Sequence, residues 1–182
     1  VGAPQHAQVV LHQTEPRAPS MIHDRKRHAW RLWSEGFHAE SLDGVAWKQT
    51  RLDVKGHVFE DPSRRERKRR YKAFANGEAL SSSDGLRFTR AKDGRAPSSI
   101  RSAFYDSRRR SYVAYKELGN ATSVRYESEA WQGPYASKLL HDAPAIVIPY
   151  YSIYVGITDA CRFAWSGDAL EWTVLAGGVI EE

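Results

Sequence analysis

Residues 82–88 read Ser-Ser-Asp-Gly-Leu-Arg-Phe, and this stretch recurs along the chain. Residues 41–47 share its pattern of Ser-x-Asp-Gly-x-x-aromatic, and residues 166–172 keep the pattern with Ala in place of Gly. An Asp-Gly pair between two extended runs favours a tight hairpin, because Gly accepts the positive φ that such a turn requires. A degenerate copy, residues 128–134, falls where a further hairpin is due. The motif therefore predicts a repeating set of hairpins.

A second repeated pattern precedes these turns. A short apolar run ends in an Asp, and a basic loop then leads into an aromatic strand, at residues 21–33, 58–74 and 103–115. Alternation of large apolar with polar or small residues on both sides of a polar loop is typical of two paired strands. Residues 146–166 show the same succession of strand-like runs but lack the Asp. Each repeat thus supplies four strands.

The spacing of the repeats predicts the architecture. The serines that open the turn motif, Ser41, Ser82, Ser128 and Ser166, are 41, 46 and 38 residues apart. Repeats of roughly 40 to 50 residues with four strands each are typical of a β-propeller. We therefore predict an all-β fold, a single β-propeller domain over residues 1–182, with four blades at about residues 19–50, 55–92, 99–135 and 143–176. Recurring aromatic residues are predicted to pack between neighbouring blades: Trp30, Trp47, Phe88, Trp131 and Trp172.

Two apolar runs are left over at the chain ends, residues 9–12 and 174–180. Each resembles one strand. The sequence leaves open whether these two strands pair to close the ring of four blades or form a reduced fifth blade.

The composition fits one compact domain. The chain has 182 residues, 41% hydrophobic and 27% charged, and its single cysteine permits no internal disulfide. No apolar run approaches the roughly 18 to 20 residues that a membrane-spanning helix needs, so a soluble protein without a membrane partner is expected. An extracellular or periplasmic location follows if a signal peptide was removed ahead of Val1. The seven histidines show no metal-ligand spacing, and neither a metal nor a cofactor is predicted.

Residues 58–62 and 70–74, followed by the turn at 80–88, resemble the five-bladed β-propeller glycosidase superfamily of invertase- and arabinanase-like enzymes, in a shortened or degenerate form. The resemblance covers roughly residues 19–175 as a pattern of repeats. It implies a glycoside hydrolase-like protein that acts on or binds a saccharide in a central funnel. It also implies acidic groups on the innermost strands: a nucleophile or base, a transition-state stabiliser and a general acid.

Candidate site residues follow from this resemblance. If the protein is an enzyme, two carboxyl groups must flank the scissile bond, about 5 Å apart for retention or about 6.5 to 9.5 Å apart for inversion. The candidate catalytic residues are Asp53, Glu60, Asp61, Glu129 and Asp142. The candidates for substrate binding are His57 and Arg101 near predicted inner-strand starts and three tyrosines that break the repeat, Tyr135, Tyr150 and Tyr151.

Several of these residues also have a purely structural interpretation. An Asp that recurs at one place in three blades, as Asp61 does with Asp24 and Asp106, is most simply explained by a shared role at a hairpin turn. Only Asp142 is a carboxylate at a predicted inner-strand start, with Asp53 just ahead of another. This scarcity favours the alternative function, a non-catalytic propeller that binds a glycan, a polyanion or a protein.

Three basic blocks, residues 25–28, 64–70 and 108–110, lie in equivalent predicted loops. They form solvated turns or, alternatively, a positive rim that attracts a polyanion.

Overall fold

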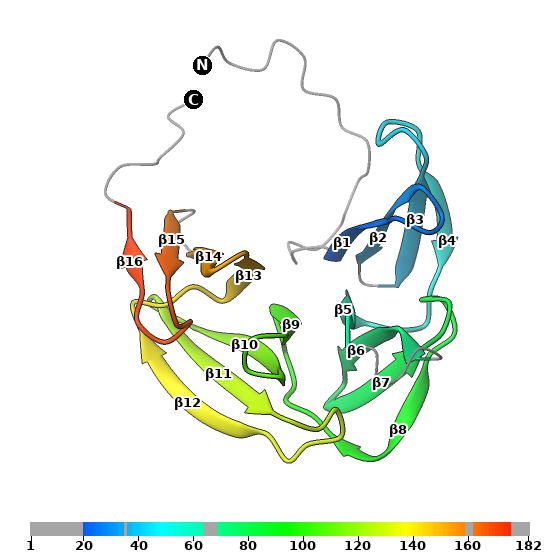
Figure 1. Ribbon diagram of the computed structural model, residues 1–182. Helices are drawn as coiled ribbons and strands as arrows, with labels where there is room; N and C mark the ends of the chain where they lie inside the picture. Colours follow the sequence, from blue (N-terminus) through cyan, green and yellow to red (C-terminus); the bar gives the residue numbers. More distant parts are fainter. Residues whose placement is uncertain (1–19, 35, 64–68, 159–161, 176–182) are drawn as a thin grey trace, which may run out of the picture.

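The computed structural model describes residues 20–34, 36–63, 69–158 and 162–175 (Figure 1). These residues form four antiparallel sheets of four strands each, arranged as the blades of a β-propeller. The predicted all-β, four-bladed fold is confirmed. In the described ranges, no helix has the length and apolar character that crossing a membrane requires.

Each sheet is built from four strands that follow one another in the chain. The first sheet contains β1 (Ser20–Asp24), β2 (Ala29–Ser34), β3 (Phe37–Ser41) and β4 (Lys48–Arg51). The second contains β5 (Gly56–Glu60), β6 (Tyr71–Ala75), β7 (Glu78–Ser82) and β8 (Thr89–Arg95). The third contains β9 (Ser102–Asp106), β10 (Ser111–Gly119), β11 (Thr122–Ser128) and β12 (Ala136–His141). The fourth contains β13 (Ile146–Tyr150), β14 (Ile153–Ile157), β15 (Phe163–Ser166) and β16 (Thr173–Val174).

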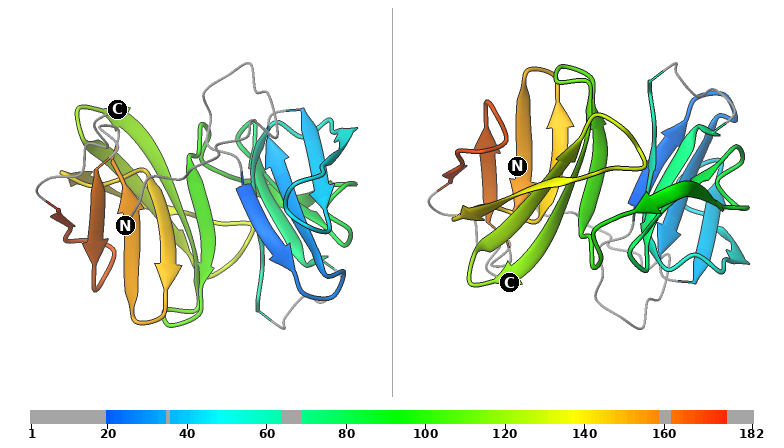
Figure 2. Two further views of the ribbon diagram at one scale, coloured as in Figure 1. Left: turned by 90° about the horizontal axis from the view of Figure 1, so that it is seen from above. Right: turned by 90° about the horizontal axis from the view of Figure 1, so that it is seen from below.

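The sheets stand around an axis with their first strands innermost (Figures 1 and 2). Strand β1 contacts β5, β5 contacts β9, and β9 contacts β13. Within the described residues, β13 and β1 make no contact of comparable extent, so the ring is open between the fourth and first sheets. Of the two leftover runs, residue 174 belongs to β16 of the fourth sheet, whereas residues 9–12 and 176–180 lie outside the described residues.

Each sheet has two faces, which we name by the neighbour they meet. The leading face packs on the following sheet, and the trailing face packs on the preceding one. Between the second and third sheets, Phe59 and Phe74 of a leading face meet Ala103 and Tyr112 of a trailing face. Trp131 fills this junction, 4.7 Å from the ring of Phe74, as the sequence predicts.

The other two junctions have the same plan. Trp33 packs with Val58 and Tyr71 between the first and second sheets. Phe104 and Tyr115 pack with Val147 and Tyr154 between the third and fourth. Because successive side chains of a strand point to opposite faces of the sheet, each blade packs one set of residues on the preceding blade and the other set on the following blade.

The predicted Asp-Gly turns lie at the outer hairpins, between the third and fourth strands. Asp84 Oδ1 accepts hydrogen bonds from the backbone N–H groups of Leu86 and Arg87 at 2.8 and 2.9 Å, and Gly85 has a φ of +76°. Asp43 and Asp168 do the same in their own blades. These aspartates form turns, as the repeat predicts.

Candidate functional site

Hydroxyl and imidazole groups lie near the starts of the inner strands, whereas the acids of these strands, Asp24, Glu60 and Asp106, lie at their ends. Ser20 Oγ lies 3.0 Å from His57 Nδ1 and accepts a hydrogen bond from the Val58 N–H at 3.2 Å. In the third sheet, Ser102 Oγ donates to the carbonyl of Ala145 at 2.7 Å and accepts from the Val147 N–H at 3.0 Å. Each serine therefore links the first strand of its sheet to the first strand of the next.

His57 and Arg101, the two sequence candidates near these strand starts, also have protein partners. Burial lowers the pKa of His57 to about 4, against the opposing effect of a hydrogen bond to the backbone of Ala103. The imidazole is therefore neutral near pH 7. Arg101 Nε donates to Glu117 Oε2 at 2.6 Å, and the Arg101 N–H donates to the carbonyl of Tyr115. Both residues connect strands in this structure.

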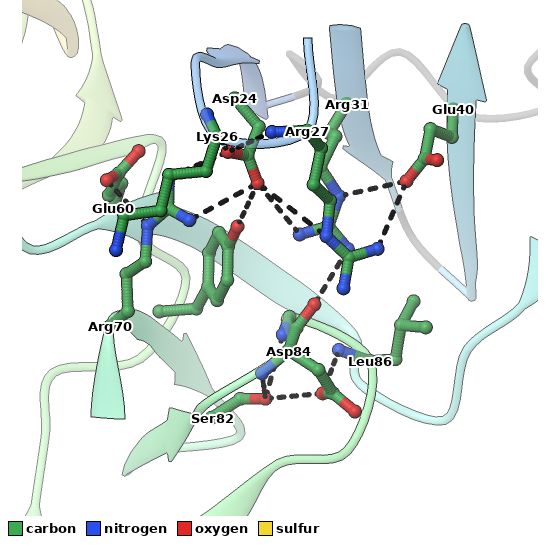
Figure 3. A network of polar contacts seen from close by, with 12 residues as sticks. Asp24, Lys26, Arg27, Arg31, Glu40, Glu60, Arg70, Ser82, Asp84 and Leu86 are labelled. Carbon is green, nitrogen blue, oxygen red and sulfur yellow. Dashed lines mark hydrogen bonds and ion pairs between the residues drawn. The ribbon is translucent and has the colours of Figure 1, made fainter. Parts of the chain in front are cut away.

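Glu60 belongs to a polar network between the first and second sheets (Figure 3). Arg70 Nε donates to Glu60 Oε1 at 2.7 Å, and Arg70 Nη2 donates to Asp24 Oδ1 at 3.0 Å. Burial opposes ionisation of Asp24, but hydrogen bonds from Arg70 and Tyr71 and the charge of Arg70 outweigh it and lower the pKa of Asp24 to about 2. The guanidinium of Arg70 therefore engages Glu60 in an ion pair, and the lowered pKa of Asp24 makes that residue unsuited to hold the proton of a general acid.

Asp61 is buried in the junction between the second and third sheets. Its Oδ2 accepts a hydrogen bond from Tyr112 Oη at 2.8 Å, and its Oδ1 accepts one from the Ser63 N–H at 2.8 Å. The ammonium of Lys72, also buried, is 3.9 Å from Oδ2. These partners occupy both oxygens, as in a structural turn residue.

The other three candidate carboxylates are exposed on three separate loops. Asp53 lies between β4 and β5, Glu129 lies in the outer turn of the third sheet, and Asp142 lies between β12 and β13. Asp142 has a φ of +52°, a backbone conformation that Asp tolerates better than most residues. Of the five candidate acids, only Glu60 and Asp61 are neighbours, as consecutive residues of the chain.

One sequence candidate, Tyr135, lines a hollow of about 510 Å³. The hollow lies between the second and third sheets, and its lining comes from both: Arg95, Ala96, Pro97, Tyr126 and residues 132–135. Arg95 ends β8, Tyr126 lies on the trailing face of β11, and residues 132–135 form the degenerate turn before β12.

The ring of Tyr135 is held firmly in this hollow. Its hydroxyl donates to the carbonyl of Trp131 at 2.7 Å, and its ring meets Phe74 edge-on with centroids 5.5 Å apart. A Cβ on Gly133 would lie 3.1 Å from this ring, so the loop backbone packs closely on it. Burial, together with the neighbouring Tyr112, raises the pKa of Tyr135 well above its usual range, and the hydroxyl remains neutral.

The chemistry of the hollow suits binding. Tyr126 and Tyr135 supply aromatic surface, Gln132 an exposed amide and Arg95 an exposed guanidinium. No lining residue carries a carboxyl group. Tyr126, Gln132 and Arg95 are absent from the sequence candidates. The sequence signal for Gln132 is the loss of the Asp-Gly turn in the third repeat, where Gln-Gly-Pro stands instead.

The other two tyrosine candidates lie on the fourth sheet, apart from the hollow. Tyr150 ends β13, and Tyr151 follows it in the turn to β14, with the two rings edge-on at 4.7 Å. Both side chains are exposed. The structure therefore separates the aromatic candidates into a walled hollow with Tyr135 and an exposed pair.

The basic blocks at 25–28 and 108–110 lie in equivalent hairpins, between the first and second strands of the first and third sheets, and are exposed. Of the block at 64–70, only Arg69 and Arg70 are described. In the described part of the chain, no three His, Cys, Asp or Glu side chains form a group that could hold a metal ion.

A scan of the chain against protein-family models matches no family, and a search of curated proteins finds no match.

Proposed function

We propose that this chain is a saccharide-binding β-propeller module of glycoside hydrolase-like type, which binds its ligand in the hollow lined by Tyr126 and Tyr135 without hydrolysing it. The observation that carries the proposal is the composition of that hollow. It combines two aromatic rings with one amide and one guanidinium, and no carboxylate lines it. The resemblance of the repeats to five-bladed glycosidases supports a saccharide as the ligand class.

The hollow offers what a sugar ring needs. Aromatic side chains pair an apolar face with polar edges, and a pocket with a few convergent polar groups fixes the orientation of its ligand. The ring of Tyr135 is already held by Trp131 and Phe74, so little side-chain entropy is lost when a ligand binds. Arg95 provides a charged partner for a uronic or sulfated sugar.

The placement of the acids supports binding over hydrolysis. A glycosidase requires one protonated and one ionised carboxyl group on opposite sides of the scissile bond. Glu60 is paired with Arg70, and Asp61 accepts hydrogen bonds on both oxygens. Asp53, Glu129 and Asp142 lie on three different loops.

The test is a calorimetric or NMR titration with fructo-, arabino- and galacturono-oligosaccharides. Gln132→Ala and Arg95→Ala remove exposed polar groups from the hollow, and each is expected to raise Kd about tenfold, which equals about 1.4 kcal/mol. Gln49→Ala and Arg51→Ala are matched controls, because both side chains are exposed on β4 of the first sheet. The controls should leave Kd unchanged. Equal effects of the hollow and control variants would contradict the proposal.

A parallel assay of reducing-sugar release separates binding from turnover. The intact chain is expected to release no sugar above background. Release that Asp53→Asn or Asp142→Asn abolishes would replace the binding proposal with hydrolysis. Binding of heparin or a polynucleotide that falls steeply with salt, and is unaffected by Gln132→Ala, would assign the ligand to the basic loops instead.

A further inference from the structure

The leading face of the fourth sheet is apolar, and no other sheet formed by the described residues covers it. Ile148, Tyr150, Phe163 and Trp165 are 44–59% exposed on this face. Ile148 occupies the position in β13 that Phe104 occupies in β9. Each is the third residue of its strand, Ile148 opposite Val155 and Phe104 opposite Val113. Phe104 is 7% exposed because the fourth sheet covers it, whereas Ile148 is 59% exposed. In the part of the chain that the structure describes, the fourth sheet therefore presents a blade-packing surface without a following blade.

The trailing face of the first sheet is exposed at Met21 and Trp30, whereas Leu32, Ala39 and Ser41 of the same face are buried. Met21 occupies the position in β1 that Val147 occupies in β13. Each is the second residue of its strand, Met21 opposite Leu32 and Val147 opposite Gly156. Val147 is 3% exposed beneath the third sheet, but Met21 is 56% exposed. Trp30, on the same face as Met21, is 38% exposed. The prediction that Trp30 packs between two blades is therefore wrong for the described residues. Both faces border the gap that the described residues leave between the fourth and first sheets (Figures 1 and 2).

Phe163 and Trp165 make the open leading face more apolar than the covered ones. The third strands of the first three sheets carry mostly polar residues at these two positions: His38 and Glu40, Ala79 and Ser81, Arg125 and Glu127. Along β13, β14 and β15, every residue of the open leading face is aliphatic or aromatic. Apolar exposure on this scale marks an interaction surface.

We propose that the occupant is a second copy of this chain, bound head to tail, with the leading face of its fourth sheet packed on the trailing face of the first sheet of the next copy. The three junctions within the chain each pack a leading face on a trailing face, and this contact continues the series. The two faces do not pack together within one copy in the described residues. Since the two surfaces differ, the contact is heterologous, and the assembly keeps one free leading face at one end and one free trailing face at the other.

The experiment is sedimentation velocity on the full chain over a concentration series. The intact chain is expected to self-associate. Trp165→Asp places a charge on the leading face, and Met21→Asp places one on the trailing face, so each variant alone should be monomeric. Leu139→Asp is the matched control, because Leu139 is 50% exposed on β12, away from both faces. It should associate like the intact chain. Far-UV circular dichroism and urea unfolding check that each variant is folded, and Ile148→Asp replaces Trp165→Asp if the latter is not.

A mixture of the two variants gives the decisive result. Trp165→Asp retains a free trailing face, and Met21→Asp retains a free leading face, so an equimolar mixture should form a one-to-one heterodimer although neither variant associates alone. A monomeric intact chain at every concentration overturns the proposal. So does a dimer that survives Met21→Asp but not Trp165→Asp, because that result indicates two fourth sheets in contact. Loss of association in Leu139→Asp also overturns it.

Discussion

Tyr71 Oη donates a hydrogen bond of 2.8 Å to Asp24 Oδ2, from the second strand of one sheet to the inner strand of the preceding sheet. The same pair recurs as Tyr112 with Asp61, and as Tyr154 with Asp106. Each Asp also accepts backbone hydrogen bonds from the loop that follows it. A single buried carboxylate therefore orders its own hairpin and positions the next blade, which accounts for its recurrence in three repeats.

We expect Tyr71→Phe to lower the free energy of unfolding by about 2 kcal/mol, because it removes a buried hydrogen bond to a charged acceptor. Trp30 occupies the position of Tyr71 in the first sheet, opposite Ser41 as Tyr71 is opposite Ser82, but among the described residues no preceding sheet covers it. Trp30→Phe should therefore cost less than about 1 kcal/mol. Urea unfolding measures both values, and equal losses would contradict a specific role for the Tyr–Asp pair.

Gly85 and Gly44 provide a second matched comparison, since both have a positive φ of +76° and +80°. A Cβ on Gly85 would lie 2.8 Å from Trp33 Cζ2, whereas a Cβ on Gly44 would be 3.7 Å from Trp30. Both substitutions by Ala strain the backbone, by about 1 kcal/mol. Gly85→Ala should cost a further 1 to 3 kcal/mol, roughly, from overpacking. Thermal unfolding of the two variants should therefore give a clearly lower Tm for Gly85→Ala, and matching Tm values would refute the overpacking argument.

Sequence periodicity predicted the fold well because the turn chemistry is local. The Ser-x-Asp-Gly pattern determines a hairpin within seven residues, and the structure places such turns at Asp43 and Asp84, and also at Asp168, where Ala169 adopts a φ of +62° in place of Gly. Recurrence also distinguishes turn aspartates from site residues, as the buried contacts of Asp61 show.

The candidate site was only partly predictable. Tyr135 is recognisable because it breaks the repeat, but Arg95 and Tyr126 join it from other strands, and only the packing of two sheets brings them together. The exposure of Trp30 was also not predictable. The sequence shows which residues recur between blades, but not that the described residues leave the ring open on the side of the first sheet.

Ser20→Ala tests the link between inner strands. The Ser20 hydroxyl is buried and accepts from the Val58 N–H at 3.2 Å, so its removal leaves a buried backbone donor without that acceptor. We expect a loss of about 1 to 3 kcal/mol in the free energy of unfolding. Hydrogen exchange should become faster at the Val58 amide in particular. Ser137→Ala, at an exposed serine of β12, is the control. Unchanged exchange at Val58 would argue against the link.

His38 makes the stability of the first sheet depend on pH. Its buried Nε2 accepts a hydrogen bond from Arg31 Nε at 3.1 Å, and burial together with the charges of Arg31 and Arg27 lowers the pKa of His38 from 6.5 to about 4. The unfolded chain therefore binds a proton before the folded chain does. The stability present above pH 6.5 is lost as the pH falls towards 4, by up to about 3 kcal/mol. His38→Gln offers an amide oxygen as the acceptor and cannot titrate, so its unfolding free energy should fall less between pH 6.5 and 4. His141→Gln, at an exposed histidine, is the control, and a His38→Gln profile parallel to that of the intact chain would show that another group causes the loss.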